Sequence, residues 1–227
     1  QALLGAPHGT VAVADCQTGG KGRLGRSFQS PGGVGVYLSM LLRPQCPPEE
    51  LMHLTCAVGA AMCDALERAC GLRPGIKWTN DLVYGHKKAA GILTELGTSP
   101  EGLYAVVGIG VNCCQEPQDF PQELRDRATS LAMETGTPID RASVAAVMME
   151  ALYRMDRELL TQKDAMLRRY RQDCVTLGKE ISLVRGEQIS HGLALDIGDN
   201  GDLIVRFSDG HVEAVSSGEV SVRGMYG

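Results

Sequence analysis

The sequence predicts an α+β fold in which a mixed or antiparallel sheet with helices is followed by a small all-β barrel. Over the first three quarters of the chain, apolar runs with strand character alternate with stripes at helical spacing. After residue 174 the pattern changes to four or five short strands, separated by turns that contain Gly, Asp and Asn. We therefore expect a large domain over residues 1–175 and a small β domain over residues 176–227.

The first strand leads into a long loop. Residues 9–16 alternate and include β-branched side chains, which predicts a strand. Residues 17–33 are rich in glycine and carry three cationic side chains and one proline. They indicate a loop, and loops of this length inside a compact domain are usually functional. The apolar run at 34–42 is typical of a buried strand.

Two helices are expected around the central strands. Prolines and acids at 47–50 suit a helix N-terminus, and the apolar stripe behind them ends at Gly71, a C-terminal cap. Asp140 is placed to cap a second, long helix that runs to about Asp173. Between these helices, residues 76–84 predict a short strand and a turn.

A paired, buried hairpin is expected between the two helices. Residues 89–96 and 103–111 form its strands, and residues 98–102 have the composition of a turn. The polar segment 115–138 follows, and residues 128–131 within it predict a short helical or extended piece.

The composition excludes several classes of protein. Hydrophobic residues make up 44% and charged residues 22%, as in globular proteins, and the net charge of -5 argues against bulk, non-specific DNA binding. No apolar run approaches the roughly 18 residues of a membrane span, and no signal peptide is visible. The eight cysteines form no C-x-x-C pair and have no His partners at zinc-finger spacing. We expect reduced thiols, a cytoplasmic location, and neither a membrane nor a nucleic-acid partner.

The glycine-rich loop contains the first motif, Gly19 to Arg26. It lacks the Gly-Lys-Ser/Thr ending of a P-loop and the G-x-G-x-x-G spacing of a dinucleotide fold. Flexible backbone amides together with Lys21, Arg23 and Arg26 can still close over an anion. A solvated surface loop with scattered charge is the alternative that these residues leave open.

Three further motifs follow in order. Residues 77–81 place a cation, an amide and a carboxylate at a strand end, which suits a phosphate and a magnesium ion, or an ordinary turn around a buried Trp. Lys87 and Lys88 enter a buried strand, so alternation turns one of them inward, unless both only protect a sheet edge. Residues 108–112 allow close approach of a ligand to a strand that ends in Asn, or form a bulge.

In their order and spacing these motifs resemble the biotin–protein ligases. That family carries G-R-G-R-x-G-R-x-W with S-P-x-G, then K-W-P-N-D, K-x-x-G-I-L-x-E and G-x-G-x-N, followed by a small SH3-like barrel. This chain reads G-K-G-R-L-G-R-S-F with S-P-G-G, K-W-T-N-D, K-A-A-G-I-L-T-E and G-I-G-V-N, and the resemblance covers about residues 10–223. It implies a class II synthetase-like catalytic domain, as in biotin and lipoate ligases, with an SH3-like C-terminal barrel.

The resemblance also implies an activity and its partners. The enzyme would use ATP and Mg²⁺ to convert biotin into biotinyl-5'-AMP, and would then transfer biotin to a lysine of a biotin carboxyl carrier protein. A lipoate or octanoate ligase of the same fold is the enzymatic alternative, and a biotin-responsive repressor whose DNA-binding domain is absent from this chain is the other. A homodimer is left open.

Residue by residue, the resemblance assigns roles to matching positions. Lys88 and Arg23 would be catalytic. The positions expected to bind biotin are Gln17, Lys21, Gly22, Arg23, Lys88, Gly91, Ile92, Leu93, Gly108 and Gly110. The positions expected near ATP are Arg23, Arg26, Lys77, Asn80, Asp81 and Asn112. Asp81 would also hold the metal, and Glu219 with Arg223 would help to dock the acceptor.

This chain departs from the family pattern in several places. Lys21 replaces Arg, which keeps the charge but loses the bidentate fork, Phe28 replaces Trp, Thr79 replaces Pro, and Gly35 stands where Asn is frequent. The family also has a Ser-Thr-Asn motif on a strand and helix ahead of Gln17. This chain begins too late to contain it, so we expect an incomplete first wall of the biotin pocket.

Overall fold

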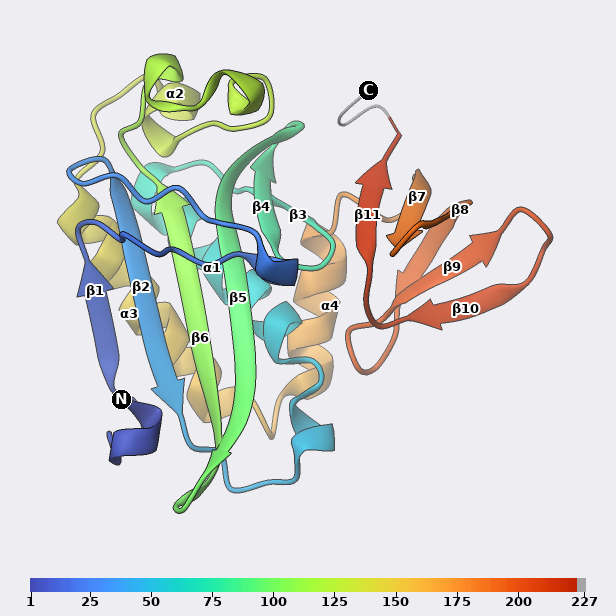
Figure 1. The fold of residues 1–227 in the computed structure, drawn as a ribbon, viewed down its shortest axis with the longest axis horizontal. Helices are drawn as coiled ribbons and strands as arrows, with labels where there is room; N and C mark the ends of the chain where they lie inside the picture. The colour runs from blue at the N-terminus through green and yellow to red at the C-terminus, as the bar shows by residue number, and fades with distance from the viewer. Residues whose placement is uncertain (224–227) are drawn as a thin grey trace.

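The computed structural model describes residues 1–223, except for the side chain of Leu24. The last four residues of the predicted small domain, 224–227, lie outside the described residues. Two antiparallel sheets follow one another along the chain, one of six strands and one of five (Figure 1). The α+β prediction is confirmed, and the pairing of its named strands is antiparallel rather than mixed.

The first sheet has the strand order β1-β2-β6-β5-β4-β3. Its strands are β1 (Val11–Ala14), β2 (Gly35–Leu42), β3 (Gly75–Lys77), β4 (Asp81–Tyr84), β5 (Lys87–Ser99) and β6 (Gly102–Asn112). The predicted hairpin is confirmed as β5 and β6, paired from Ala90 opposite Val111 to Ser99 opposite Gly102. The predicted strand and turn at 76–84 form two short strands, β3 and β4, because Lys77 pairs with Asp81 across a tight turn.

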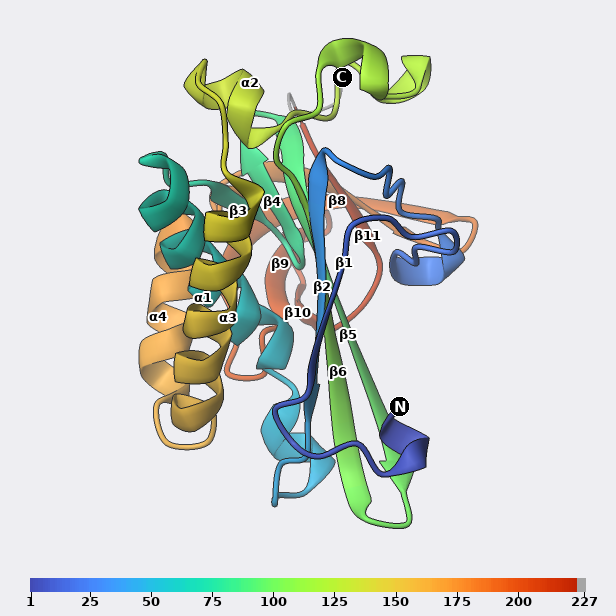
Figure 2. The same ribbon diagram turned by 90° about the vertical axis from the view of Figure 1, so that its left-hand side faces the viewer.

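Helices cover one face of this sheet (Figure 2). The long ones are α1 (Leu54–Cys70), α3 (Arg141–Glu158) and α4 (Lys163–Asp173), and α2 (Leu131–Thr135) is a single short piece. Gly71 caps α1 with φ 76° and donates its N–H to the carbonyl of Glu67, as predicted. Leu54, Val58, Met62 and Leu66 of α1 are almost fully buried in the core between helices and sheet.

The prediction of one helix from Asp140 to Asp173 is wrong in its length. Asp140 does cap α3, accepting from the N–H groups of Ala142 and Ser143, but the chain reverses after Glu158 and α4 runs back along α1 (Figure 1). The imidazole of His53 hydrogen-bonds the Leu159 carbonyl at 3.1 Å, so this end of the helix is satisfied by a side chain of another segment. Burial lowers the pKa of His53, so the ring is neutral and donates through Nε2.

The second sheet, which we call the C-terminal sheet, has the order β10-β9-β8-β7-β11. Its strands are β7 (Glu180–Arg185), β8 (Gln188–Ile197), β9 (Leu203–Phe207), β10 (Val212–Val215) and β11 (Glu219–Val222). The carbonyl of Gly201, in the turn between β8 and β9, accepts a hydrogen bond from the Trp78 indole at 3.0 Å. The same carbonyl oxygen lies 3.8 Å from the Cys56 sulfur, so the two contacts join the C-terminal sheet to the end of β3 and the start of α1.

The cysteines and the helices bear on the expectations from composition. All eight cysteines are free thiols, and Cys56 and Cys63 of α1 are fully buried. Among residues 1–223, no helix is both long enough and apolar enough to span a bilayer.

Candidate active site

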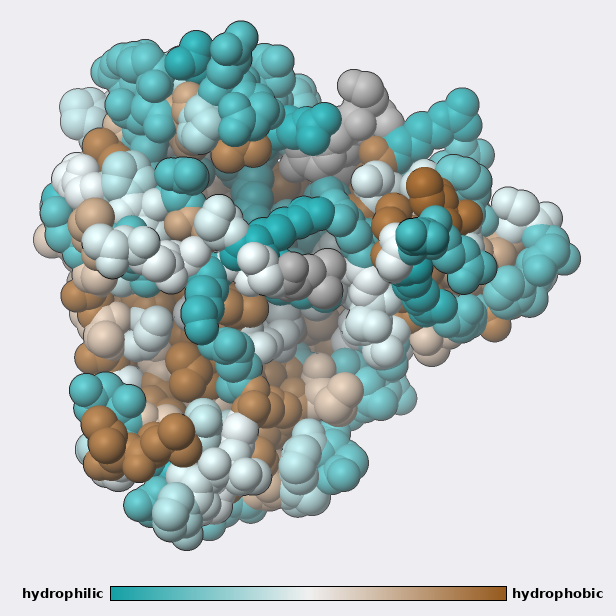
Figure 3. All heavy atoms as spheres, viewed as in Figure 1, coloured by the Kyte–Doolittle hydropathy of each residue, from teal (hydrophilic) through white to brown (hydrophobic). Residues whose placement is uncertain are grey.

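A cavity of about 240 Å³ lies between the glycine-rich loop and the sheet face that the helices leave uncovered. In the space-filling view, hydrophilic side chains lie across the middle of this largely hydrophobic face (Figure 3). The cavity is lined by the loop, by β5 and by β6. Around it the structure places every residue that the resemblance assigned to biotin: Gln17, Lys21, Gly22, Arg23, Lys88, Gly91, Ile92, Leu93, Gly108 and Gly110.

The loop is folded back on itself over the cavity. The N–H of Gly22 donates to the Arg26 carbonyl at 2.7 Å, and the N–H of Phe28 donates to the Gly20 carbonyl at 2.9 Å. A Cβ on Gly20 would lie 2.4 Å from the Phe28 carbonyl oxygen, so this close backbone approach requires glycine. The short helical turn η2 (Arg23–Gly25) sits at the tip.

A glycine patch on the sheet receives the aromatic ring of the loop. A Cβ on Gly110 would lie 2.4 Å from the Phe28 ring, and one on Gly91 would lie 3.4 Å from the same ring. The Lys88 ammonium lies 6.0 Å from the centre of that ring. Phe28 therefore forms the wall that the family pattern gives to Trp, and the strand glycines make the room for it.

Arg23 is held at the cavity edge by a short chain of hydrogen bonds. Its Nη1 donates to Asn80 Oδ1 at 3.0 Å, and Asn80 Nδ2 donates to the Ile92 carbonyl at 2.9 Å. The guanidinium of the loop is thereby tied to β5, although Asn80 and Ile92 are distant in sequence from the loop. An arginine in this position can bind an anion in the cavity through its remaining N–H groups.

At the cationic end of the cavity, two cationic side chains are paired with carboxylates. Lys88 Nζ lies 2.6 Å from Asp81 Oδ1, and Arg26 is paired with Glu219 at the start of β11. Burial lowers the pKa of Lys77; the charges of Lys88 and Arg26 act in the same direction, and those of Asp81 and Glu219 oppose it. The two carboxylates thus hold cations that an incoming phosphate could take over.

Asp81 is the residue expected to hold a magnesium ion. Among residues 1–223 no group of three His, Cys, Asp or Glu side chains could hold a metal ion. Asp81 is a single carboxylate with one oxygen already on Lys88. Mg²⁺ commonly binds one or two carboxylates together with substrate phosphates, so these residues fit the ion only as partners of a bound nucleotide.

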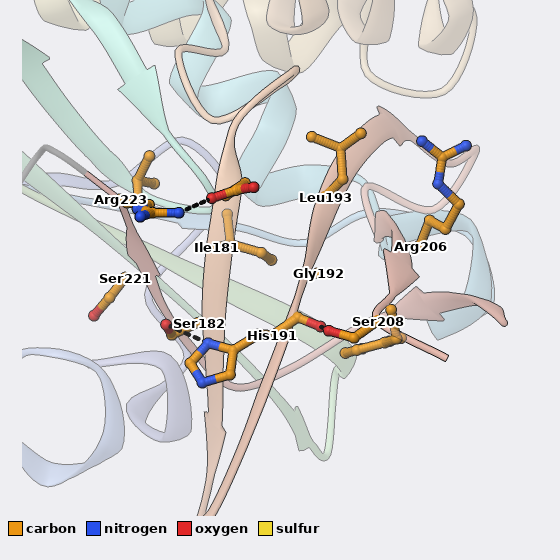
Figure 4. A pocket seen from close by; sticks show the side chains of 12 residues that line it. Ile181, Ser182, His191, Gly192, Leu193, Arg206, Ser208, Ser221 and Arg223 are labelled. Atoms are coloured by element: carbon orange, nitrogen blue, oxygen red, sulfur yellow. Dashed lines mark hydrogen bonds and ion pairs between the residues drawn. The ribbon is translucent and has the colours of Figure 1, made fainter. Parts of the chain in front are cut away.

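Six predicted residues do not line the cavity itself, namely Arg26, Lys77, Asp81, Asn112, Glu219 and Arg223. Asn112 is buried; its Nδ2 donates to the Thr129 carbonyl at 3.0 Å, and its Oδ1 accepts from Gln115 at 3.2 Å. Arg223 is paired with Glu180 beside an open hollow of about 710 Å³ on the C-terminal sheet (Figure 4). The predicted nucleotide contact of Asn112 would need these hydrogen bonds to rearrange.

Sequence reasoning missed several wall residues, namely Leu38, Ser39, Glu95, Val106 and Ile109. Ser39 had a usable signal, because it is a small polar residue inside the apolar run of β2 and pairs with Gly108. The other wall residues can be identified only once the register of β2, β6 and β5 is known.

Comparison with known proteins places this geometry in a family. Residues 3–112 match the biotin/lipoate A/B protein ligase family, and residues 176–223 match the biotin protein ligase C-terminal domain. The bifunctional ligase/repressor BirA of Bacillus subtilis is 34% identical over 219 residues, which is 96% of this chain and 67% of the relative. The biotin–[acetyl-CoA-carboxylase] ligase of Paracoccus denitrificans is 35% identical over 195 residues, or 84% of this chain and 81% of the relative.

A solved structure supports the same placement. The biotin protein ligase from Aquifex aeolicus in complex with biotin and ATP superposes with a TM-score of 0.81 at 32% identity, covering 96% of this chain and 90% of that one. The motifs, the cavity they surround and these similarities agree along nearly the whole sequence, and the chain belongs to the biotin protein ligase family.

Proposed function

We propose that this chain activates biotin with ATP to form biotinyl-5'-AMP and then attaches biotin to a lysine of an acceptor protein. The observation that carries the proposal is the convergence of the loop, Lys88 and the strand glycines on one cavity. The cavity has an apolar part beside Ile92 and Leu93 and a cationic end at Lys88, which suits an apolar acid whose carboxylate must react.

In the first step the biotin carboxylate oxygen attacks the α-phosphorus of ATP, a P–O bond forms, and the bond to pyrophosphate breaks. Two anions must approach, so cations are needed at the reacting groups. Lys88 would leave Asp81 for the carboxylate and phosphate, and Arg23, steadied by Asn80, would hold the α-phosphate side. Positioning of the two substrates supplies much of the remaining rate enhancement.

The loop would protect the product. A mixed anhydride of biotin and AMP hydrolyses if water reaches it, and the closed segment from Gly20 to Phe28 covers the cavity. We assign Arg26 and Lys77 to the β- and γ-phosphates, because both lie at the cationic end and both face carboxylates that phosphate would replace.

The finer parts of the proposal concern the ion, the acceptor and the location. Mg²⁺ would arrive with ATP, with Asp81 as its protein ligand, and would neutralise phosphate charge. The acceptor would be a biotin carboxyl carrier protein in the cytoplasm, docking near Glu219 and Arg223 of the C-terminal sheet. We place the boundary between the catalytic and C-terminal domains at residues 175 and 176, just after α4.

Separate assays of the two half-reactions test this function. With biotin, ATP and Mg²⁺ the protein is expected to release pyrophosphate, and addition of a biotin carboxyl carrier domain is expected to give a biotinylated lysine. Lipoate and octanoate serve as competing acids. Transfer of either of these without transfer of biotin would contradict the proposal.

A further inference from the structure

A second hollow, of about 210 Å³, adjoins the biotin cavity. The two share three wall residues, Arg23, Ile92 and Leu93. The hollow lies where the C-terminal sheet meets the first sheet, and its outer walls come from the start of α1 and from the turn at Asn200–Asp202. Arg23, Ile92 and Leu93 therefore stand between this hollow and the biotin cavity.

Four residues with hydroxyl groups line this hollow, namely Thr55, Thr79, Thr94 and Ser216. The hydroxyls of Thr55 and Thr94 are 2.6 Å apart and satisfy each other. The Thr79 Oγ1 is buried and has no hydrogen-bond partner among residues 1–223. Buried polar atoms almost always have a partner, so Thr79 marks a place where a polar ligand group is expected.

The charges in the hollow have a simple arrangement. Asp202 is its one carboxylate and Arg23 its one cation. Arg23 is held by Asn80 at the shared wall, whereas Asp202 stands on the outer side, in the turn of the C-terminal sheet. Among residues 1–223 no side chain forms an ion pair or hydrogen bond with the Asp202 carboxylate. A cation entering from outside would therefore meet a carboxylate first.

The turn that carries Asp202 is firmly placed. The carbonyl of Gly201 accepts from the Trp78 indole at 3.0 Å and from the Cys56 thiol at 3.8 Å. A Cβ on Gly201 would lie 2.7 Å from the Cys56 sulfur, and its φ of +84° also favours glycine. The outer wall of the hollow is thus part of the rigid seam and does not depend on a mobile loop.

We propose that this hollow is the access channel for the aminoalkyl side chain of the acceptor lysine. The inference rests on the proposed function, because a closed loop over the adenylate requires a separate path for the nucleophile. Asp202 attracts the ammonium group, the apolar surfaces of Met52 and Leu93 contact the methylenes, and Thr79 Oγ1 accepts a hydrogen bond from the amine.

The transfer step balances without another reactant. The lysine ammonium first loses one proton to water, and the neutral amine nitrogen forms a bond to the acyl carbon of biotinyl-AMP. The carbon–oxygen bond to phosphate breaks, its electron pair leaves with AMP, and the second amine proton passes to water. Asp202 and Thr79 are positioning residues here, since they orient the amine and do not touch the adenylate.

The test uses Asp202→Asn and Thr79→Val in the full chain, with Asp199→Asn as the matched control. Asp199 is an exposed carboxylate in the same turn that does not line the hollow. We expect both variants to release pyrophosphate at the rate of the unchanged protein, and to raise the KM for a biotin carboxyl carrier domain about tenfold. Thr79→Ser, which keeps the hydroxyl, should restore the KM, and Asp199→Asn should behave like the unchanged protein.

Hydroxylamine, a small uncharged nucleophile, distinguishes a defect in access of the acceptor lysine from a defect in the transfer reaction. It should consume the adenylate equally fast in all variants. Unchanged acceptor KM values in Asp202→Asn and Thr79→Val would overturn the channel, and so would a raised KM for ATP or an equal loss with hydroxylamine. If the unchanged protein makes no biotinyl-AMP at all, the proposed function itself fails, which is a different result.

Discussion

Gly110 offers a sharp test of how the loop closes the cavity. An alanine methyl at this position would lie 2.4 Å from Cε1 and 2.7 Å from Cζ of Phe28, about 1 Å inside normal carbon–carbon contact. Overpacking of this kind costs about 1–3 kcal/mol. Phe28 can avoid the overlap by leaving the sheet together with its loop. The substitution therefore destabilises the closed state of the loop relative to the open state. The open population should rise about 5- to 150-fold.

Trypsin measures this opening directly, because Lys21, Arg23 and Arg26 are its cleavage sites within the loop. When opening and closing are fast, cleavage of native protein follows the open population. Gly108→Ala is the control: it lies on the same strand and lines the same cavity, but its methyl would meet the nearest atom, the Leu93 carbonyl oxygen, at 3.6 Å. We expect faster cleavage in Gly110→Ala only. Equal cleavage in the two variants would refute the role of Phe28 as the anchor of the closed loop.

Three other substitutions test separate parts of the structure. Lys88→Met should lower biotin-dependent pyrophosphate release by about 10²–10³-fold while the circular dichroism spectrum is retained, because the Lys88 pair with Asp81 is partly exposed and contributes little to folding. The pKa of Lys77 is lowered from the ordinary value of 10.5, so its ammonium group loses its proton at a lower pH than that of an exposed lysine. ATP affinity, measured by calorimetry, should therefore fall as the pH rises through this lowered pKa. The Lys77→Arg variant stays charged and should lack this decline. Asp140→Ala removes the cap of α3 and should lower the free energy of unfolding by about 1 kcal/mol in urea, with no change in adenylate formation.

The elements that sequence reasoning predicted well are those with local signals. The strands β5 and β6 are long apolar runs around a turn, and the caps Gly71 and Asp140 act on their own helices. The reversal between α3 and α4 has no such signal. The helical stripe continues through Leu159, which is itself buried, and the carbonyl of Leu159 at the helix end accepts a hydrogen bond from His53, more than a hundred residues away.

The residues of the candidate site also differ in whether a local sequence signal identifies them. The motifs identify the loop, Lys88 and the strand glycines, since each has an unusual residue type at a strand end or in a strand. The pairing of Arg26 with Glu219 could not be predicted, because it depends on where the C-terminal sheet packs. Asn112 was expected to face a ligand, yet its side chain hydrogen-bonds Thr129 and Gln115, and a strand-end position alone does not distinguish the two.

The hydrogen bond between Trp78 and Gly201 gives this protein an internal optical reporter. Trp78 is the single tryptophan of the chain, it is 4% exposed, and its indole N–H is held by a backbone carbonyl of the C-terminal sheet. Its fluorescence therefore arises from one site, the seam between the two sheets. Separation of the sheets would admit water to the indole and shift its emission to longer wavelength. Movement of this seam during substrate binding can thus be followed in the unlabelled protein.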